Sequence, residues 1–170
     1  LSTDQLVALT TTQVAALSTL QVSAIASDDL AAMETADIAA LSTAVIAKLS
    51  TAQISALTTD QLVGLTTKQA AALTTAQITS IAAADLASME TSDVAALSTA
   101  VIAKLATAQI AAMTTDQLMR LSTIQTNALT TAQISALTTD QLIGLSTKQA
   151  AALTTTLVGA LTTSQVGALS

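Results

Sequence analysis

The chain has 170 residues, of which 51% are hydrophobic, and this composition is typical of a protein that buries a core and not of a disordered one. It contains no His, Cys, Phe, Tyr, Trp or Pro, which excludes the common catalytic triads, disulfides and the usual zinc sites. The net charge of -6 and the absence of a basic run argue against nucleic-acid binding, and no run approaches the roughly 18 to 20 apolar residues of a membrane span.

The whole chain is a series of eight-residue repeats. Counted from Leu1, it holds twenty-one octads without insertion or deletion and ends in Leu169-Ser170. Position 1 of the octad is Leu, Ile or Met in every copy, position 3 is Thr in nineteen copies, position 5 is Gln in fourteen, and position 6 is aliphatic except at Thr126. Such a fixed period is the signature of a solenoid, so residues 1–170 are predicted to form one continuous array.

The apolar positions decide which secondary structure carries the octad. Positions 1, 6 and 8 are of mixed parity, so in a simple strand their side chains would point to both faces. In a continuous helix, at about 100° per residue, the apolar stripe would rotate by about 80° in each octad. A short helix that begins anew in every octad remains, and a β-solenoid with turns between its rungs is the alternative.

Local chemistry supports a helix start in each octad. From Leu9 onward, Thr10 is placed as the N-cap and Gln13 as the N3 residue of a capping box, and Leu9 and Val14 flank them as a hydrophobic staple. The same pattern follows along the chain at Ser50–Gln53, Thr58–Gln61, Thr130–Gln133 and Thr162–Gln165. The kink between helices then falls at positions 1 and 2, where an N-cap residue needs no Gly.

Helices of about six residues do not persist alone in water, so they are predicted to stack. We therefore expect an all-α superhelix with positions 1, 6 and much of 8 in a shared core and with Thr and Gln on the exterior. The segment from Met33 to Lys48 returns at Met89 to Lys104, seven octads later, and the segment from Thr51 to Leu65 returns ten octads later. Tandem duplication explains these copies; a sharper hypothesis is that they span whole turns of roughly 3.3 to 3.5 octads.

The acidic residues are the only candidates for a metal site. Carboxylates on neighbouring turns could bind Ca²⁺ through oxygen ligands. The alternative is structural: four of the Asp residues occupy position 5, where an anion suits the helix N-terminus and can complete the capping box. The candidates are Asp28, Asp29, Glu34 and Asp37, with Asp85, Glu90 and Asp93 in the second copy.

Lysine and scattered apolar residues have structural interpretations. Lys48 and Lys104 each follow the last Asp of their copy by eleven residues, so ion pairs between rungs are an option. Lys68 and Lys148 have no phosphate loop or oxyanion hole near them in the sequence, and no catalytic residue is assigned. Apolar residues replace the usual polar ones at Leu20, Val45, Val101, Ile124 and Leu157, and these either contact other arrays or are tolerated at the surface.

The octads at Leu73 to Ser80 and Leu129 to Ala136 resemble the repeat tracts of large bacterial secreted or surface proteins of adhesin type. The resemblance implies an extracellular or cell-surface location. Taken with the missing chemistry, it favours a structural protein: a filament subunit or a surface-protein stalk that associates with itself end to end or laterally. The alternative is a repeat module that binds a glycan or a peptide. The first and last octads look like internal copies, so we expect either flanking sequence or end-to-end joining.

Overall fold

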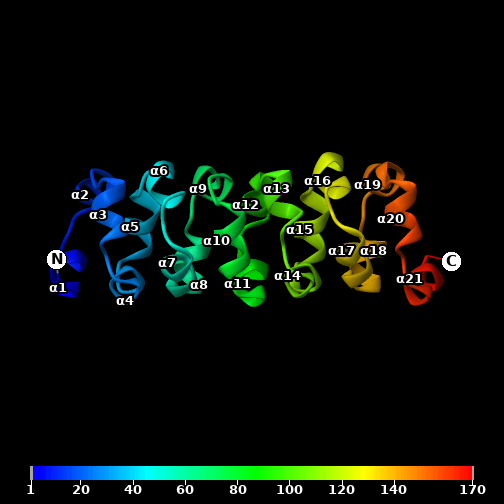
Figure 1. The fold of residues 1–170 in the computed structure, drawn as a ribbon, viewed down its shortest axis with the longest axis horizontal. Coiled ribbons are helices and arrows are strands. Elements are labelled where there is room, and N and C mark those ends of the chain that lie inside the picture. Colours follow the sequence, from blue (N-terminus) through cyan, green and yellow to red (C-terminus); the bar gives the residue numbers. More distant parts are fainter. Residues whose placement is uncertain (1, 170) are drawn as a thin grey trace.

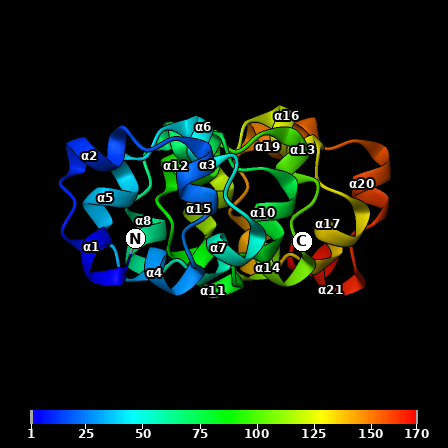
Figure 2. The same ribbon diagram turned by 60° about the vertical axis from the view of Figure 1, so that its left-hand side comes forward.

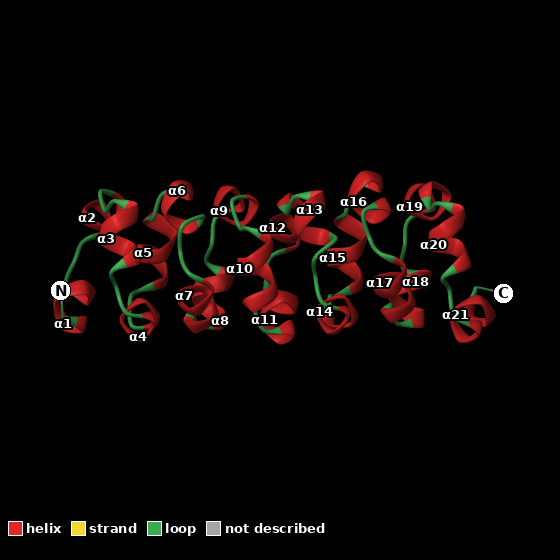
Figure 3. Cartoon of the chain, viewed as in Figure 1, coloured by secondary structure: helices red, strands yellow, loops and turns green. Residues whose placement is uncertain are grey.

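The computed structural model describes residues 2–169 and shows one short α-helix in each octad, with no strand in that range (Figure 3). The all-α prediction is therefore confirmed. The helices are α1 (Thr3–Val7), α2 (Thr11–Ala15), α3 (Thr19–Ser23), α4 (Ser27–Ala31), α5 (Thr35–Ala40), α6 (Thr43–Ile46), α7 (Thr51–Ala56), α8 (Thr59–Val63), α9 (Thr67–Ala71), α10 (Thr75–Ser80), α11 (Ala83–Ser88), α12 (Thr91–Ala96), α13 (Thr99–Ile102), α14 (Thr107–Ala112), α15 (Thr115–Arg120), α16 (Thr123–Asn127), α17 (Thr131–Ala136), α18 (Thr139–Ile143), α19 (Thr147–Ala152), α20 (Thr155–Gly159) and α21 (Thr163–Ala168).

Each helix begins at position 3 of its octad, directly after the N-cap position of the predicted capping box. At α2, the Gln13 backbone N–H donates to Thr10 Oγ1 at 3.3 Å, and the Thr10 backbone N–H donates to Gln13 Oε1 at 2.8 Å. Thr10 has extended backbone angles, φ -80° and ψ 155°, which turn the chain out of the preceding helix. No residue in the described range has a positive φ, so the kinks need no glycine, as expected.

Five helices begin without a side-chain cap. Their N-cap residues are Ala or Glu, yet these keep the extended backbone of the other caps. At α14 the cap Ala106 has no hydroxyl, and only the reciprocal half of the box forms, from the Ala106 N–H to Gln109 Oε1 at 2.8 Å. Packing therefore sets the kink even where the local signal is incomplete.

The helices wind into a rod-shaped superhelix whose first and last helices lie at opposite ends (Figure 1). Helices that pack closely are three octads apart, such as α2 on α5, α9 on α12 and α11 on α14. Figure 2 shows the coils stacked along the rod. Side-chain hydrogen bonds between coils join residues 23 to 31 positions apart, so the neighbouring coil lies about three to four octads away. This interval includes the expected 3.3 to 3.5 octads per turn.

The core follows the predicted positions 1 and 6. The side chain at position 6 is nearly always fully buried, as at Ile54 and Ile110. The side chain at position 1, next to the kink, is also buried in the core, as at Leu57 and Leu97. The polar exception, Thr126, is also buried, and its Oγ1 donates to the Ser122 carbonyl oxygen at 3.0 Å. The alanines of position 8 are half-buried in the middle of the rod.

Successive coils approach closely at Gly64, where a side chain would collide with Thr35 of the preceding coil. A Cβ there would meet the Cγ2 methyl of Thr35 and lie 3.1 Å from the Asp60 carbonyl oxygen, whereas a Cβ at Gly159 would meet nothing within 4 Å. We expect Gly64→Ala to lower the free energy of unfolding by about 2 kcal/mol, because the coils must separate. Gly159→Ala should raise it by about 0.5 kcal/mol, because alanine restricts the unfolded chain. Urea unfolding of both variants tests this, and equal effects would contradict the close approach.

Candidate functional site: the glutamine ladder and the outer surface

The glutamine at position 5 connects each coil to the one before it. Gln117 shows the arrangement: its Oε1 accepts from the Thr114 backbone N–H at 3.0 Å, within its own helix cap. Its Nε2 donates to the carbonyl oxygens of Leu86 at 3.0 Å and Met89 at 2.9 Å, in the preceding coil. One side chain thus satisfies an unpaired N–H at a helix start and two carbonyls around a helix end.

This contact recurs along the rod, and we call the series the glutamine ladder. The carbonyl acceptors lie 28 and 31 residues earlier in the chain, or 28 and 30 residues earlier at Gln125. All its members are buried. They are Gln53, Gln61, Gln69, Gln77, Gln109, Gln117, Gln125, Gln133, Gln141, Gln149 and Gln165.

The expected Thr and Gln exterior is therefore wrong for Gln, although it holds for most Thr side chains. The capping box accounts for only the Oε1 end of the amide. The Nε2 end reaches a coil whose position depends on the superhelix, and no local pattern gives that position. The clue in the sequence was the preference for Gln over Glu at position 5. Glu would also complete a capping box, but an ionised Glu cannot donate to carbonyl oxygens.

The ladder is interrupted where position 5 is not Gln. Val45, Val101 and Leu157 fill this position with buried apolar side chains, 2%, 2% and 5% exposed. Neither expectation for them, contacts between arrays or tolerated surface residues, is correct, because position 5 faces the preceding coil. Leu20 and Ile124 at position 4 are in contrast exposed, at 81% and 71%.

The four aspartates at position 5 occupy the N3 site but do not complete the capping box. Asp is shorter than Gln by one methylene, and the caps before it are Ala or Glu. Three of these carboxylates instead accept from a Thr hydroxyl 26 residues earlier: Thr59 donates to Asp85 at 2.6 Å, Thr67 donates to Asp93 at 2.7 Å, and Thr3 donates to Asp29. They replace the ladder contact with a different bond between coils.

The calcium candidates are spread over different environments. Asp37 and Asp93 are buried, Asp29 and Asp85 are half-buried, and Asp28, Glu34 and Glu90 are exposed. Among residues 2–169, no three acidic side chains converge as a group that could hold a metal ion. Calcium binding stays a prediction that needs a solution measurement.

Asp37 is the carboxyl group with a perturbed pKa. Burial raises its pKa above the ordinary value of 3.8, and the nearby Glu34 carboxylate raises it further. A raised pKa in the folded state means that ionisation opposes folding: the cost is absent well below pH 3.8 and grows as the pH rises through the folded pKa.

We therefore expect Asp37→Asn to gain stability relative to the natural chain as the pH rises from 3 toward 7. Urea unfolding followed by circular dichroism across this pH range measures the difference. Asp60→Asn, which neutralises an exposed carboxylate, is the control for the loss of one charge. A stability difference for Asp37→Asn that does not change with pH would contradict the assignment.

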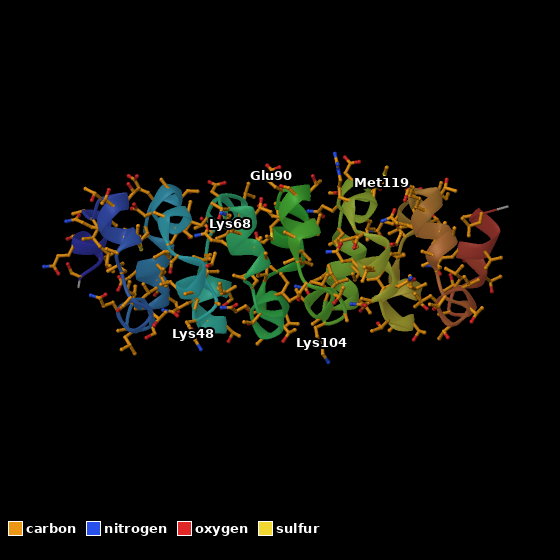
Figure 4. All side chains as sticks on the ribbon, turned by 90° about the horizontal axis from the view of Figure 1, so that it is seen from above. Lys48, Lys68, Glu90, Lys104 and Met119 are labelled. Atoms are coloured by element: carbon orange, nitrogen blue, oxygen red, sulfur yellow. The ribbon has the colours of Figure 1, made fainter. Side chains whose placement is uncertain are left out.

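The lysines are exposed, and Lys48 and Lys104 project outward from the rod (Figure 4). Neither forms the expected ion pair with the aspartates of its copy within the described range. The reason is geometric: both lysines are exposed on the outside of the rod, whereas Asp37 and Asp93 are buried and Asp93 bonds to Thr67 of the preceding coil.

A hollow on the outer surface has mixed chemistry. It measures about 460 Å³ and is lined by Thr91, Asp116, Met119 and Arg120 on α12 and α15.

Across residues 2–169, no helix is both long and apolar enough to cross a membrane.

Short capped helices, packing between coils and the glutamine ladder define a helical solenoid repeat protein. The model of the ALTTAQ repeat family matches residues 30–67, 86–123, 115–147 and 125–155, together well over half of the chain. The chain belongs to the ALTTAQ repeat family. No curated protein and no solved structure matches it significantly.

Proposed function

We propose that this chain is a noncatalytic structural protein whose rod forms the body of an extracellular filament or the stalk of a cell-surface protein. The observation that carries the proposal is the glutamine ladder, in which each new coil donates to carbonyls of the coil before it. Such stacking adds length without changing the cross-section, which suits a spacer or a filament. The likeness of the octads to adhesin-type surface tracts supports the extracellular location.

The first coil supports association end to end. Gln5, Gln13 and Gln21 form capping boxes, but their Nε2 atoms donate to no carbonyl in the described range, and all three side chains are exposed. Beside them a hollow of about 350 Å³ is lined by Leu17, Gln21, Ala24, Ile25 and Asp29. A coil stacked on this face, from further octads or from a second copy, would continue the ladder and fill the hollow.

The alternative, a module that binds a glycan or a peptide, has one feature in its favour. The hollow beside Met119 and Arg120 combines a cation, a carboxylate and a thioether. The chain has no Tyr or Trp, the side chains that most often anchor recognition, so the structural role has the stronger support.

Electron microscopy of the purified chain over a concentration series, with and without calcium, tests the proposal. Regular fibres that lengthen with concentration would support a filament subunit. Uniform short rods at all concentrations would favour a stalk, and calcium-dependent fibres would support binding by the acidic residues. Compact particles without a long axis would contradict both structural roles.

A further inference from the structure

The lysines all belong to octads that lie along one edge of the rod, and two of them, Lys48 and Lys104, project from the same margin in Figure 4. Helices α3, α6 and α9 pack in succession, as do α13, α16 and α19, and Figure 1 shows all six along the same edge. We call these helices, with the residues that complete their octads, the lysine edge. None of the eleven acidic residues of the chain lies in these octads. All the lysines do: Lys48, Lys68, Lys104 and Lys148.

The carboxylates gather on other helices. Helices α5, α8 and α11 pack in succession, as do α12, α15 and α18, and we call these six helices the acidic side, although α12 also packs on α9 of the lysine edge. Figure 4 shows Lys48 and Lys104 at one margin of the rod and Glu90 at the opposite margin. Each helix of the acidic side has a half-buried or exposed carboxylate in its octad: Glu34, Asp60, Asp85, Glu90, Asp116 and Asp140.

The two charged faces have a common spacing along the rod. Lys48 and Lys104 are 56 residues apart, and so are Glu34 and Glu90. Each pair occupies the same octad position seven octads apart, so one translation along the superhelix relates the members of both pairs. All four side chains are exposed, and within residues 2–169 none of them takes part in an ion pair.

We propose that the lysine edge of one rod docks on the acidic side of a second copy lying parallel to it, with Lys48 and Lys104 facing Glu34 and Glu90. This inference rests on the proposed structural role. Each docked copy still presents its own free lysine edge, so the contact is heterologous and continues into a sheet or bundle. Exposed ion pairs are individually weak, so the contact depends on their repetition and weakens with salt.

Apolar side chains accompany the charges on both faces. Leu20 and Ile124 are exposed on α3 and α16 of the lysine edge. Met119 and Ile143 are exposed on α15 and α18 of the acidic side, at 47% and 56%. Docking would remove part of this apolar surface from water.

The spacing argues for a second copy as the occupant. The lysines are single and far apart along the rod, whereas an anionic polymer or membrane is bound by dense basic clusters. A copy of the same chain supplies carboxylates at the 56-residue spacing of Lys48 and Lys104.

Sedimentation velocity and electron microscopy at low and high salt test the proposal. The double variant Lys48→Glu with Lys104→Glu should weaken side-by-side association at least tenfold, and so should Glu34→Lys with Glu90→Lys. Mixing the two variants should restore association, because each then carries the complement of the other. High salt should dissociate the natural bundles.

A control variant with the same 56-residue spacing distinguishes the effect of where the charges lie from the effect of net charge. Ala52→Glu with Ala108→Glu adds two carboxylates at exposed positions of α7 and α14, which are also 56 residues apart. It has the same net charge as Lys48→Gln with Lys104→Gln, yet only the latter should weaken association. Equal loss in both, or no recovery in the mixture, would overturn the proposal. If the variants still form rods or fibres and their side-by-side association is unchanged, the proposed structural role is supported and the docking is refuted.

Discussion

Gln117→Glu should lower the free energy of unfolding by about 3 kcal/mol at neutral pH and by much less in mild acid. The carboxylate can still accept from the Thr114 N–H, so the capping box survives. It cannot donate to the carbonyl oxygens of Leu86 and Met89, and it places a buried charge against them. Burial should raise the pKa of the new carboxyl group above the ordinary value of about 4.3, so the penalty is present at high pH and disappears as the pH falls through the folded pKa.

Urea unfolding at pH 7 and pH 4, followed by circular dichroism, measures this effect. The matched control is Gln13→Glu, because Gln13 has the same capping box but is exposed and donates to no coil. Its stability should change by less than about 0.5 kcal/mol. Similar losses for the two variants, or a loss at Gln117 that is independent of pH, would show that the cap alone explains the glutamine.

Leu57→Asp should cost about 4 kcal/mol and unfold the neighbouring octads. Leu57 is 4% exposed and belongs to the continuous core, so the substitution both removes packing and buries an unpaired charge. In a solenoid each coil is stabilised by its neighbours, so the loss should spread beyond the octad. Hydrogen exchange along the chain shows how far the unfolding extends.

Asp60→Ser, three residues away, is the control for this prediction. Asp60 is exposed at position 4 of its octad, and we expect a change within about 0.5 kcal/mol. If the two substitutions had comparable effects on the unfolding midpoint in urea, the assignment of position 1 to the core and position 4 to the surface would be wrong.

The candidate site was only partly predictable from the sequence. Gln13 was correctly assigned to a capping box. The second role of the glutamines was missed, as was the burial of Val45 and Val101, because both depend on a coil that lies more than three octads away. The shared margin of Lys48 and Lys104 agrees with the hypothesis that seven octads span whole turns, whereas the position of Glu90 at the opposite margin depends on the superhelix.

The sequence by itself determined the repeating element of this fold, a short capped helix in each octad. The helix start, its cap and its apolar positions are decided within about six residues, because capping and side-chain burial in a short helix are local effects. The tertiary structure alone decided which coil each glutamine reaches, which aspartates are buried and how charge is distributed around the rod. Those features depend on the rotation from one octad to the next, and this rotation is set by packing between helices three octads apart.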